Sequence, residues 1–128
     1  MYKTPEPVFT ELTKFNNQWD DEQRGRVKWQ TLFSSGETPT RELSSGIAEM
    51  DPGDVFKTHR HKQAEIYYFI KGTGLVQIGE NTQPVEAGTA VFIPGDSWHS
   101  VSNNSGEPLR FFYTFAADSF GDIQYEFQ

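Results

Sequence analysis

The chain has 128 residues and contains no cysteine. This absence excludes disulfides, thiolate nucleophiles and thiolate metal sites. Histidine is scarce as well, with three in the chain, and the 11 Lys and Arg residues are outnumbered by 18 Asp and Glu, which gives a net charge of −7. Because phosphate binding requires a basic face, we expect no nucleic-acid partner and no binding to an anionic membrane surface.

Long apolar runs are also missing. No stretch is long enough to span a bilayer, and the first residues, MYKTPEPVF, lack the apolar segment of a signal peptide. We therefore expect a cytoplasmic protein without a membrane partner. The length fits one domain with a closed core.

Aromatic residues are abundant, at 15% of the chain. They can fill a β core, line an apolar pocket, or do both. From residue 27 onward, short segments rich in β-branched and aromatic residues alternate with Gly and Pro turns. These predicted strands are VKWQTLF, LSSGIAEM, VFKTH, EIYYFIK, LVQIG, TAVFIP, HSVS and LRFFYTFA, with ENTQ as a hairpin turn. Many short strands at regular spacing predict an all-β sandwich or barrel.

The segment before residue 27 has a different pattern. Prolines at positions 5 and 7 predict an extended arm over residues 1–8. Phe9, Leu12 and Phe15 recur at helical spacing, which predicts a short helix over residues 10–18. The stretch QWDDEQRGR reads as an exposed polar segment.

Two of the three histidines stand in the stretch HRHKQAE. In a strand, His59 and His61 point to the same face, and a turn at KQA would bring Glu65 close to them. Two imidazoles and a carboxylate form half of a divalent-metal site. The alternative is a surface histidine pair on a basic turn, because Lys57, Arg60 and Lys62 surround it.

The spacing of the neighbouring residues favours the metal site. Gly53 precedes His59 by five intervening residues, and Gly72 follows Glu65 by six. Downstream, the stretch GTAVFIPGDSWHSVSN places Gly88, Pro94, His99 and Asn103 at comparable fixed intervals. With these two stretches the chain resembles the cupin superfamily, whose two motifs carry the same residues. One position departs: Asp96 stands where the second motif has a glycine, which predicts a slightly altered turn before His99.

The resemblance implies an all-β fold, a small antiparallel jelly-roll β-barrel with a short N-terminal arm or helix. It implies a single cupin domain over residues 1–128, with an arm at 1–26, a barrel at 27–117 and a C-terminal segment at 118–128. It also implies one divalent transition metal, which could be Fe, Mn, Ni, Co or Zn, held inside the barrel by His59, His61, Glu65 and His99. Asn103 would support a turn, and a homodimer is expected because small cupins often pair.

Residues near the metal follow from strand alternation. If Glu65 points inward, Tyr67 and Phe69 do so too, while Ile66, Tyr68 and Ile70 face outward. A nearby cation lowers the pKa of a phenol, so Tyr67 is a candidate base. Alternatively, Tyr67 is a core residue whose hydroxyl bonds to Glu65. Phe111, Tyr113 and Phe115 share one face of the last long strand and are expected in the core.

A closer resemblance is to the short cupins that cleave dimethylsulfoniopropionate to dimethyl sulfide and acrylate. It rests on VKWQTLF, AEIYYFIKGTG and FYTFAADSFGDIQYEF. It implies a metal-dependent lyase that acts on a small carboxylate, with Tyr67 and Tyr125 catalytic and Trp29 and Phe69 at the substrate. The alternatives are another metal-dependent cupin enzyme on a small acid or sugar, such as a dioxygenase, isomerase or cyclase, and a non-catalytic small-molecule-binding cupin.

Overall fold

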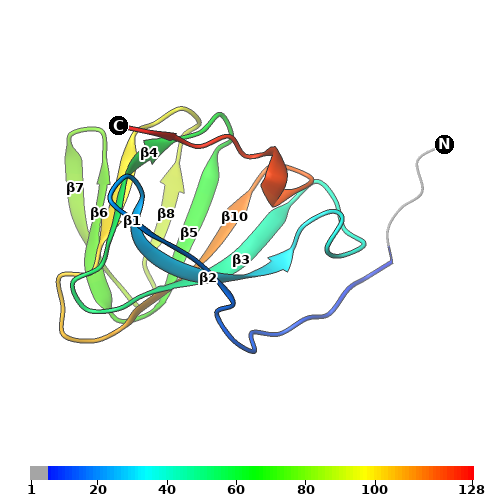
Figure 1. Cartoon of the computed structure of the whole chain (residues 1–128), viewed down its shortest axis with the longest axis horizontal. Helices are drawn as coiled ribbons and strands as arrows, with labels where there is room; N and C mark the ends of the chain where they lie inside the picture. Colours follow the sequence, from blue (N-terminus) through cyan, green and yellow to red (C-terminus); the bar gives the residue numbers. More distant parts are fainter. Residues whose placement is uncertain (1–5) are drawn as a thin grey trace.

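A computed structural model describes residues 6–128, which form eleven β-strands and one short 3-10 helix (Figure 1). The strands are β1 Asn17–Asp21, β2 Gly25–Phe33, β3 Ser44–Met50, β4 Val55–Arg60, β5 Glu65–Lys71, β6 Thr73–Ile78, β7 Asn81–Glu86, β8 Ala90–Ile93, β9 His99–Ser102, β10 Leu109–Phe115 and β11 Glu126–Phe127. The 3-10 helix spans Phe120–Asp122. The predicted all-β fold is confirmed.

All the strands belong to one antiparallel sheet, in the order β7-β6-β9-β4-β2-β3-β10-β5-β8. β1 pairs with β2, and β11 pairs with β4. The sheet curls on itself, as the expected jelly-roll barrel requires, with β7 and β8 as its two edge strands (Figure 1). The order places β4 beside β9, so segments about 40 residues apart in the sequence become neighbours.

The interior of the barrel is filled by the inward residues of β3, β5 and β10. Burial alternates strictly along β10, and on β5 Glu65, Tyr67 and Phe69 are buried while Ile66, Tyr68 and Ile70 are not. Each large apolar side chain removed from water stabilises the fold by about 1.5–3 kcal/mol. The aromatic surplus of the sequence therefore builds this core.

The helix predicted over residues 10–18 is wrong. Residues 6–16 carry no regular structure, and β1 begins at Asn17. The helical spacing of apolar residues was misleading, because the first of them, Phe9, is 95% exposed and packs against no core. The extended arm predicted for residues 1–8 lies largely outside the described residues.

Three short strands were not predicted. The segment NQWDD, read as an exposed polar stretch, is the edge strand β1, in which Trp19 alone is partly buried. The predicted turn ENTQ is wrong beyond Glu80, because β7 starts at Asn81. Pro84 has no backbone N–H to donate. β7 tolerates it because an edge strand has no second neighbouring strand to which that N–H would have to donate. β11, at the C-terminal end, pairs Phe127 with His59 of β4.

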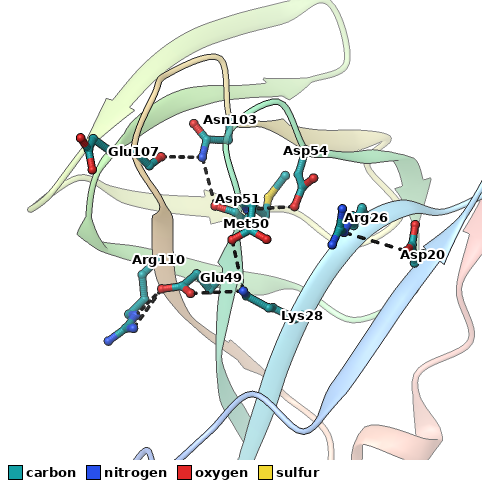
Figure 2. Close-up of polar contacts among 10 residues, drawn as sticks. All are labelled: Asp20, Arg26, Lys28, Glu49, Met50, Asp51, Asp54, Asn103, Glu107 and Arg110. Carbon is teal, nitrogen blue, oxygen red and sulfur yellow. Dashed lines mark hydrogen bonds and ion pairs between the residues drawn. The ribbon is translucent and has the colours of Figure 1, made fainter.

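Asn103 closes a turn, as predicted. Its side-chain amide donates to the carbonyl oxygens of Met50 (3.0 Å) and Glu107 (2.8 Å) (Figure 2). Its side-chain oxygen accepts from the backbone N–H of Ser105. These bonds fix the loop after β9 against the end of β3. Asn103 is thereby occupied away from the three histidines.

Candidate metal centre

Two adjacent strands hold the three histidines. His59 of β4 and His99, the first residue of β9, are register partners, and His61 follows directly after β4. In a regular strand, residues three apart point to opposite faces. A register shift between Phe56 and His59 instead lets the side chains of these two residues both point inward. All three imidazoles are almost fully buried. The predicted convergence of the three histidines is confirmed.

The backbone sets the orientation of each ring. The Nδ1 atoms of His59, His61 and His99 lie 2.7, 2.9 and 2.8 Å from the carbonyl oxygens of Lys57, Gln63 and Ser97. A carbonyl can only accept, so each Nδ1 carries a proton, and Nε2 is the ring nitrogen that faces the cluster. The ligand atoms of the three rings lie within 4.8 Å of one another. Nε2 of His59 and of His99 has no hydrogen-bond partner among the described residues.

Glu65 lies beside the three histidines. Its Oε1 atom lies 3.1 Å from Nε2 of His61 and 3.5 Å from Nε2 of His99, and the side chain is 4% exposed. A carboxylate oxygen and ring nitrogens at these distances are held together by a positive charge, which a proton on Nε2 of His61 or a bound cation supplies. Three nitrogens and one oxygen are ligands that suit a divalent transition ion, so these residues fit such a metal.

Burial keeps His59 in the form that binds metal. Removal from water, together with the neighbouring His99 and His61, lowers the pKa of His59 to about 2. A neutral imidazole is the form that coordinates a cation. His59 is therefore ready to bind without first losing a proton.

The loops that carry the ligands contact each other at Gly95. A side chain at this position would collide with the carbonyl oxygen of Lys62, so only glycine allows the contact. The backbone N–H of Asp96 donates to the carbonyl oxygen of His61 at 2.7 Å. Asp96 has φ +62°, a left-handed conformation that glycine adopts easily and that Asp tolerates. The departure at Asp96 thus preserves the turn and leaves His99 in place.

A cavity of about 30 Å³ lies beside Glu65, and three of its lining residues, Phe56, Phe115 and Tyr125, contact the histidine rings. Its walls are aromatic or apolar apart from one carboxylate. The lining residues are Trp19, Val27, Trp29, Ala48, Phe56, Glu65, Tyr67, Phe111, Tyr113, Phe115, Phe120 and Tyr125. A water molecule needs about 10–15 Å³ of such space, so the cavity has room for about two waters.

Three tyrosines line this cavity, Tyr67, Tyr113 and Tyr125, and burial raises the pKa of each. Burial raises the pKa of Tyr67 and of Tyr125 well above the ordinary value, and the carboxylate of Glu65 raises both further. The hydroxyl of Tyr67 is buried without a hydrogen-bond partner among the described residues, so the alternative bond to Glu65 is not formed. A cation bound beside them would act in the opposite direction and favour the phenolate.

The other predicted site residues divide into two groups. Trp29 and Tyr125 line the cavity, as do Phe111, Tyr113 and Phe115, which were expected in the core and are also buried. Phe69 is fully buried, 5.1 Å from Phe111 between ring centres, and does not line the cavity.

Sequence reasoning missed three aromatic lining residues, Trp19, Phe56 and Phe120. Trp19 lies edge-on to Tyr125, Trp29 and Phe56 with ring centres 5.0, 5.2 and 5.8 Å apart. The polar residues on either side of Trp19 led us to predict an exposed segment. An apolar residue isolated in a polar segment was the only available signal.

Comparison with known proteins agrees with this architecture. Residues 46–115 match the family described as Cupin domain. The chain belongs to the cupin family. This cupin is 40% identical over 107 residues to dimethylsulfoniopropionate lyase DddW of Ruegeria pomeroyi, which covers 84% of this chain and 70% of that protein.

Solved cupin structures resemble it as well. A cupin-2 domain protein from Rhodospirillum rubrum aligns with a TM-score of 0.72 and 25% identity, over 92% of this cupin and 81% of that chain. A predicted oxalate decarboxylase from Thermotoga maritima aligns with a TM-score of 0.70 and 22% identity, over 79% and 90% of the respective chains. The second likeness supports the fold alone.

Within residues 6–128, no helix is long and apolar enough to cross a membrane.

Proposed function

We propose that this cupin is a metal-dependent lyase that cleaves dimethylsulfoniopropionate to dimethyl sulfide and acrylate. The observation that carries the proposal is the position of three converging Nε2 atoms and Glu65 beside an aromatic cavity that also contains Tyr67 and Tyr125. The similarity to dimethylsulfoniopropionate lyase DddW supports the choice of substrate.

His59, His61, His99 and Glu65 would hold the ion, which could be Fe, Mn, Ni, Co or Zn. When bound, a divalent ion supplies a Lewis acid that can bind the substrate carboxylate and acidify the neighbouring α C–H bond. The protein's own contribution is to orient three imidazoles through their Nδ1 bonds, to keep His59 neutral by burial, and to exclude bulk water from the cavity.

A tyrosine would act as the base. Tyr125 or Tyr67, as phenolate, would remove the α proton of the substrate. The electron pair of that C–H bond would form the new C=C bond, and the C–S bond would break with its electrons leaving on sulfur. The products would be neutral dimethyl sulfide and acrylate, and the proton on the tyrosine would pass to solvent.

The aromatic walls suit the cationic end of the substrate. A sulfonium group is attracted to aromatic faces, most strongly to tryptophan. Trp29 and Trp19 line the same side of the cavity and contact each other. They would bind the sulfonium, while the carboxylate end of the substrate would face the ligand cluster.

Substrate binding would require the cavity to widen. Dimethylsulfoniopropionate is much larger than the two or so waters that 30 Å³ can hold. Phe120 and Tyr125 lie on the segment after β10, whose 3-10 helix has no buried residue and whose last strand has two residues. We expect this segment to move outward when substrate enters.

The decisive experiment measures product release. The protein is loaded separately with each candidate metal and incubated with dimethylsulfoniopropionate, and dimethyl sulfide and acrylate are measured by gas and liquid chromatography. We expect equal amounts of both products. Absence of product with every metal would contradict the proposal, and oxygen consumption with Fe(II) and a small organic acid would favour a dioxygenase instead.

Replacement of a single hydroxyl tests the base. We expect Tyr125→Phe to retain its metal but to lose turnover by about 100-fold or more, because general base catalysis contributes 10²–10⁴-fold. Tyr67→Phe is the matched comparison, since its hydroxyl shares the cavity. Full activity in both variants would exclude Tyr125 and Tyr67 as the base.

A further inference from the structure

One wall of the cavity is built from three rows of side chains that cross neighbouring strands. In the sheet, β2, β3, β10 and β5 lie side by side (Figure 1). Their register defines the rows, because residues paired across strands project to the same face. Successive rows are two residues apart on each strand, or about 6.6 Å along it. The first row is Ser44, Phe115 and Glu65, the second is Thr31, Gly46, Tyr113 and Tyr67, and the third is Trp29, Ala48, Phe111 and Phe69.

The chemistry of the cavity changes from row to row. The first row supplies the carboxylate of Glu65, which lies beside the histidines. The second row supplies the phenol groups of Tyr67 and Tyr113. The side chains of the third row are aromatic or apolar, and three of them line the cavity. An elongated ligand whose anionic end lies at the histidines and Glu65 therefore places its other end against the third row.

Ala48 is the smallest side chain of the third row. It is 3% exposed and pairs with Trp29 on one side and with Phe111 on the other. All three residues line the cavity. Phe69 closes the row beyond Phe111, with the two ring centres 5.1 Å apart. The space at this end of the cavity is therefore the space that the short side chain of Ala48 leaves free.

Gly46 keeps the middle of the cavity open in front of Ala48. The side chain of Tyr113 lies against Gly46, because a Cβ atom at position 46 would collide with its hydroxyl and ring. The ring of Tyr113 therefore packs onto the sheet. A larger residue at position 46 would push this ring toward the space that leads to the third row.

The wall at Ala48 is fixed by the sheet. Every residue of β3, Ser44–Met50, pairs with β10, and residues 45–49 also pair with β2. Phe120 and Tyr125, in contrast, belong to the segment that we expect to move outward. An entering substrate can thus widen the cavity at that segment but not at Ala48.

We propose that Ala48 determines the size of the cationic head group that the cavity accepts. The ligand class is a short carboxylate that ends in a methylated onium centre. Its carboxylate lies at the histidines and Glu65, and its methyl groups lie between Ala48 and the ring of Trp29, which attracts the positive charge. Methyl groups fit beside the alanine and ethyl groups do not. This inference rests on the proposed function, because it places the sulfonium of dimethylsulfoniopropionate in the third row.

Selectivity between head groups tests the role of Ala48. The kcat/KM values of the metal-loaded protein are measured for dimethyl- and diethylsulfoniopropionate. Ala48→Gly should raise the ratio of diethyl to dimethyl activity at least about 10-fold, because one methylene in an apolar pocket changes selectivity by about 10–200-fold. Ala48→Val should raise the KM for the dimethyl substrate at least about 10-fold, with unchanged metal content by elemental analysis. Ala90→Val, at an exposed position of β8, is the matched control and should change neither value.

Binding of unreactive analogues separates this inference from the lyase proposal. Trimethylammoniopropionate and triethylammoniopropionate have similar shapes but carry a poor leaving group, so isothermal titration calorimetry can measure their Kd values without turnover. The wild type should prefer the trimethyl compound at least about 10-fold, and Ala48→Gly should lose most of this preference.

The outcomes distinguish the two proposals. A wild type that releases no dimethyl sulfide but shows the preference, which Ala48→Gly then loses, contradicts the lyase alone and supports the role of Ala48. An Ala48→Gly variant that keeps wild-type selectivity, in turnover or in binding, overturns the role of Ala48 alone. A wild type that neither binds the analogues nor releases product overturns both.

Discussion

Each histidine of the metal centre is fixed by a hydrogen bond from Nδ1 to the carbonyl of a residue two positions away. Lys57 holds His59, Gln63 holds His61 and Ser97 holds His99. A local bond of this kind orients the ring as soon as the strand or turn forms. The three Nε2 atoms are therefore organised before any ion arrives.

His99 connects the second motif to the first, so its loss should affect binding most clearly. We expect His99→Ala to bind metal at least about 10-fold more weakly, because it removes a ligand and even outer groups that only orient ligands contribute 10–100-fold. Metal content after dialysis, measured by elemental analysis, checks this. Gln83→Ala on the exposed edge strand β7 is the control. Undiminished metal in the His99 variant would exclude His99 as a ligand.

Much at the residue scale could be predicted from the sequence. Alternation along β5 placed Tyr67 inside and Tyr68 outside, and their exposures of 1% and 47% confirm this. Trp19 could not be predicted, because it is the single apolar residue of a polar strand and its burial depends on Tyr125, more than 100 positions away. Such long-range contacts leave no local periodicity.

At the scale of elements, the site depends on two loops as much as on strands. The loop between β4 and β5 and the loop between β8 and β9 meet where Gly95 contacts Lys62. Asp96 adds its backbone bond to His61. This contact fixes the position of His61 relative to His99.

A methyl group at Gly95 should break the contact between the loops. We expect Gly95→Ala to lower the free energy of unfolding by about 1–3 kcal/mol, because the added atom must displace the backbone of Lys62. Gly106→Ala is the matched control: nothing lies within 4 Å of its added Cβ, and it should change stability by less than about 1 kcal/mol. Urea denaturation measures both, and equal stability of the two variants would contradict this account.

The elements that sequence patterns missed share a physical cause. Phe9, Leu12 and Phe15 have helical spacing, but the arm has no second layer against which a helix could pack. β7 and β1 lie at the margins of the sheet, where polar residues, proline and short length are tolerated. Central strands such as β5 and β10 are buried on one face. Their apolar residues therefore recur at every second position, and this alternation predicted the strands correctly.

At the scale of the whole molecule, the ion would join parts of the barrel that are distant in sequence. His59 and His61 belong with β4, Glu65 with β5 and His99 with β9, and the sheet order separates β5 from β9 by several strands. A ligand that binds only the folded state stabilises it by mass action. The ion should therefore stabilise the closed barrel.

Removal of the metal should lower the melting temperature. At a free metal concentration 100 times the Kd, binding adds about 2.7 kcal/mol, which corresponds to roughly 10 °C for a domain of this size. Differential scanning calorimetry with and without a chelator measures the shift. The His99→Ala variant should respond little. A wild-type melting temperature that is insensitive to both metal and chelator would argue against an ion in the barrel.

The alternation along β5 has a consequence for folding. Its register is fixed on both sides, since Tyr67 faces Tyr113 of β10 and Val91 of β8. A slip by one residue would turn Glu65 and Tyr67 toward water and place Ile66 and Tyr68 inside. Misregistered molecules would lack the centre altogether, so the fraction of a preparation that can take up metal also measures the fraction that has paired its strands correctly.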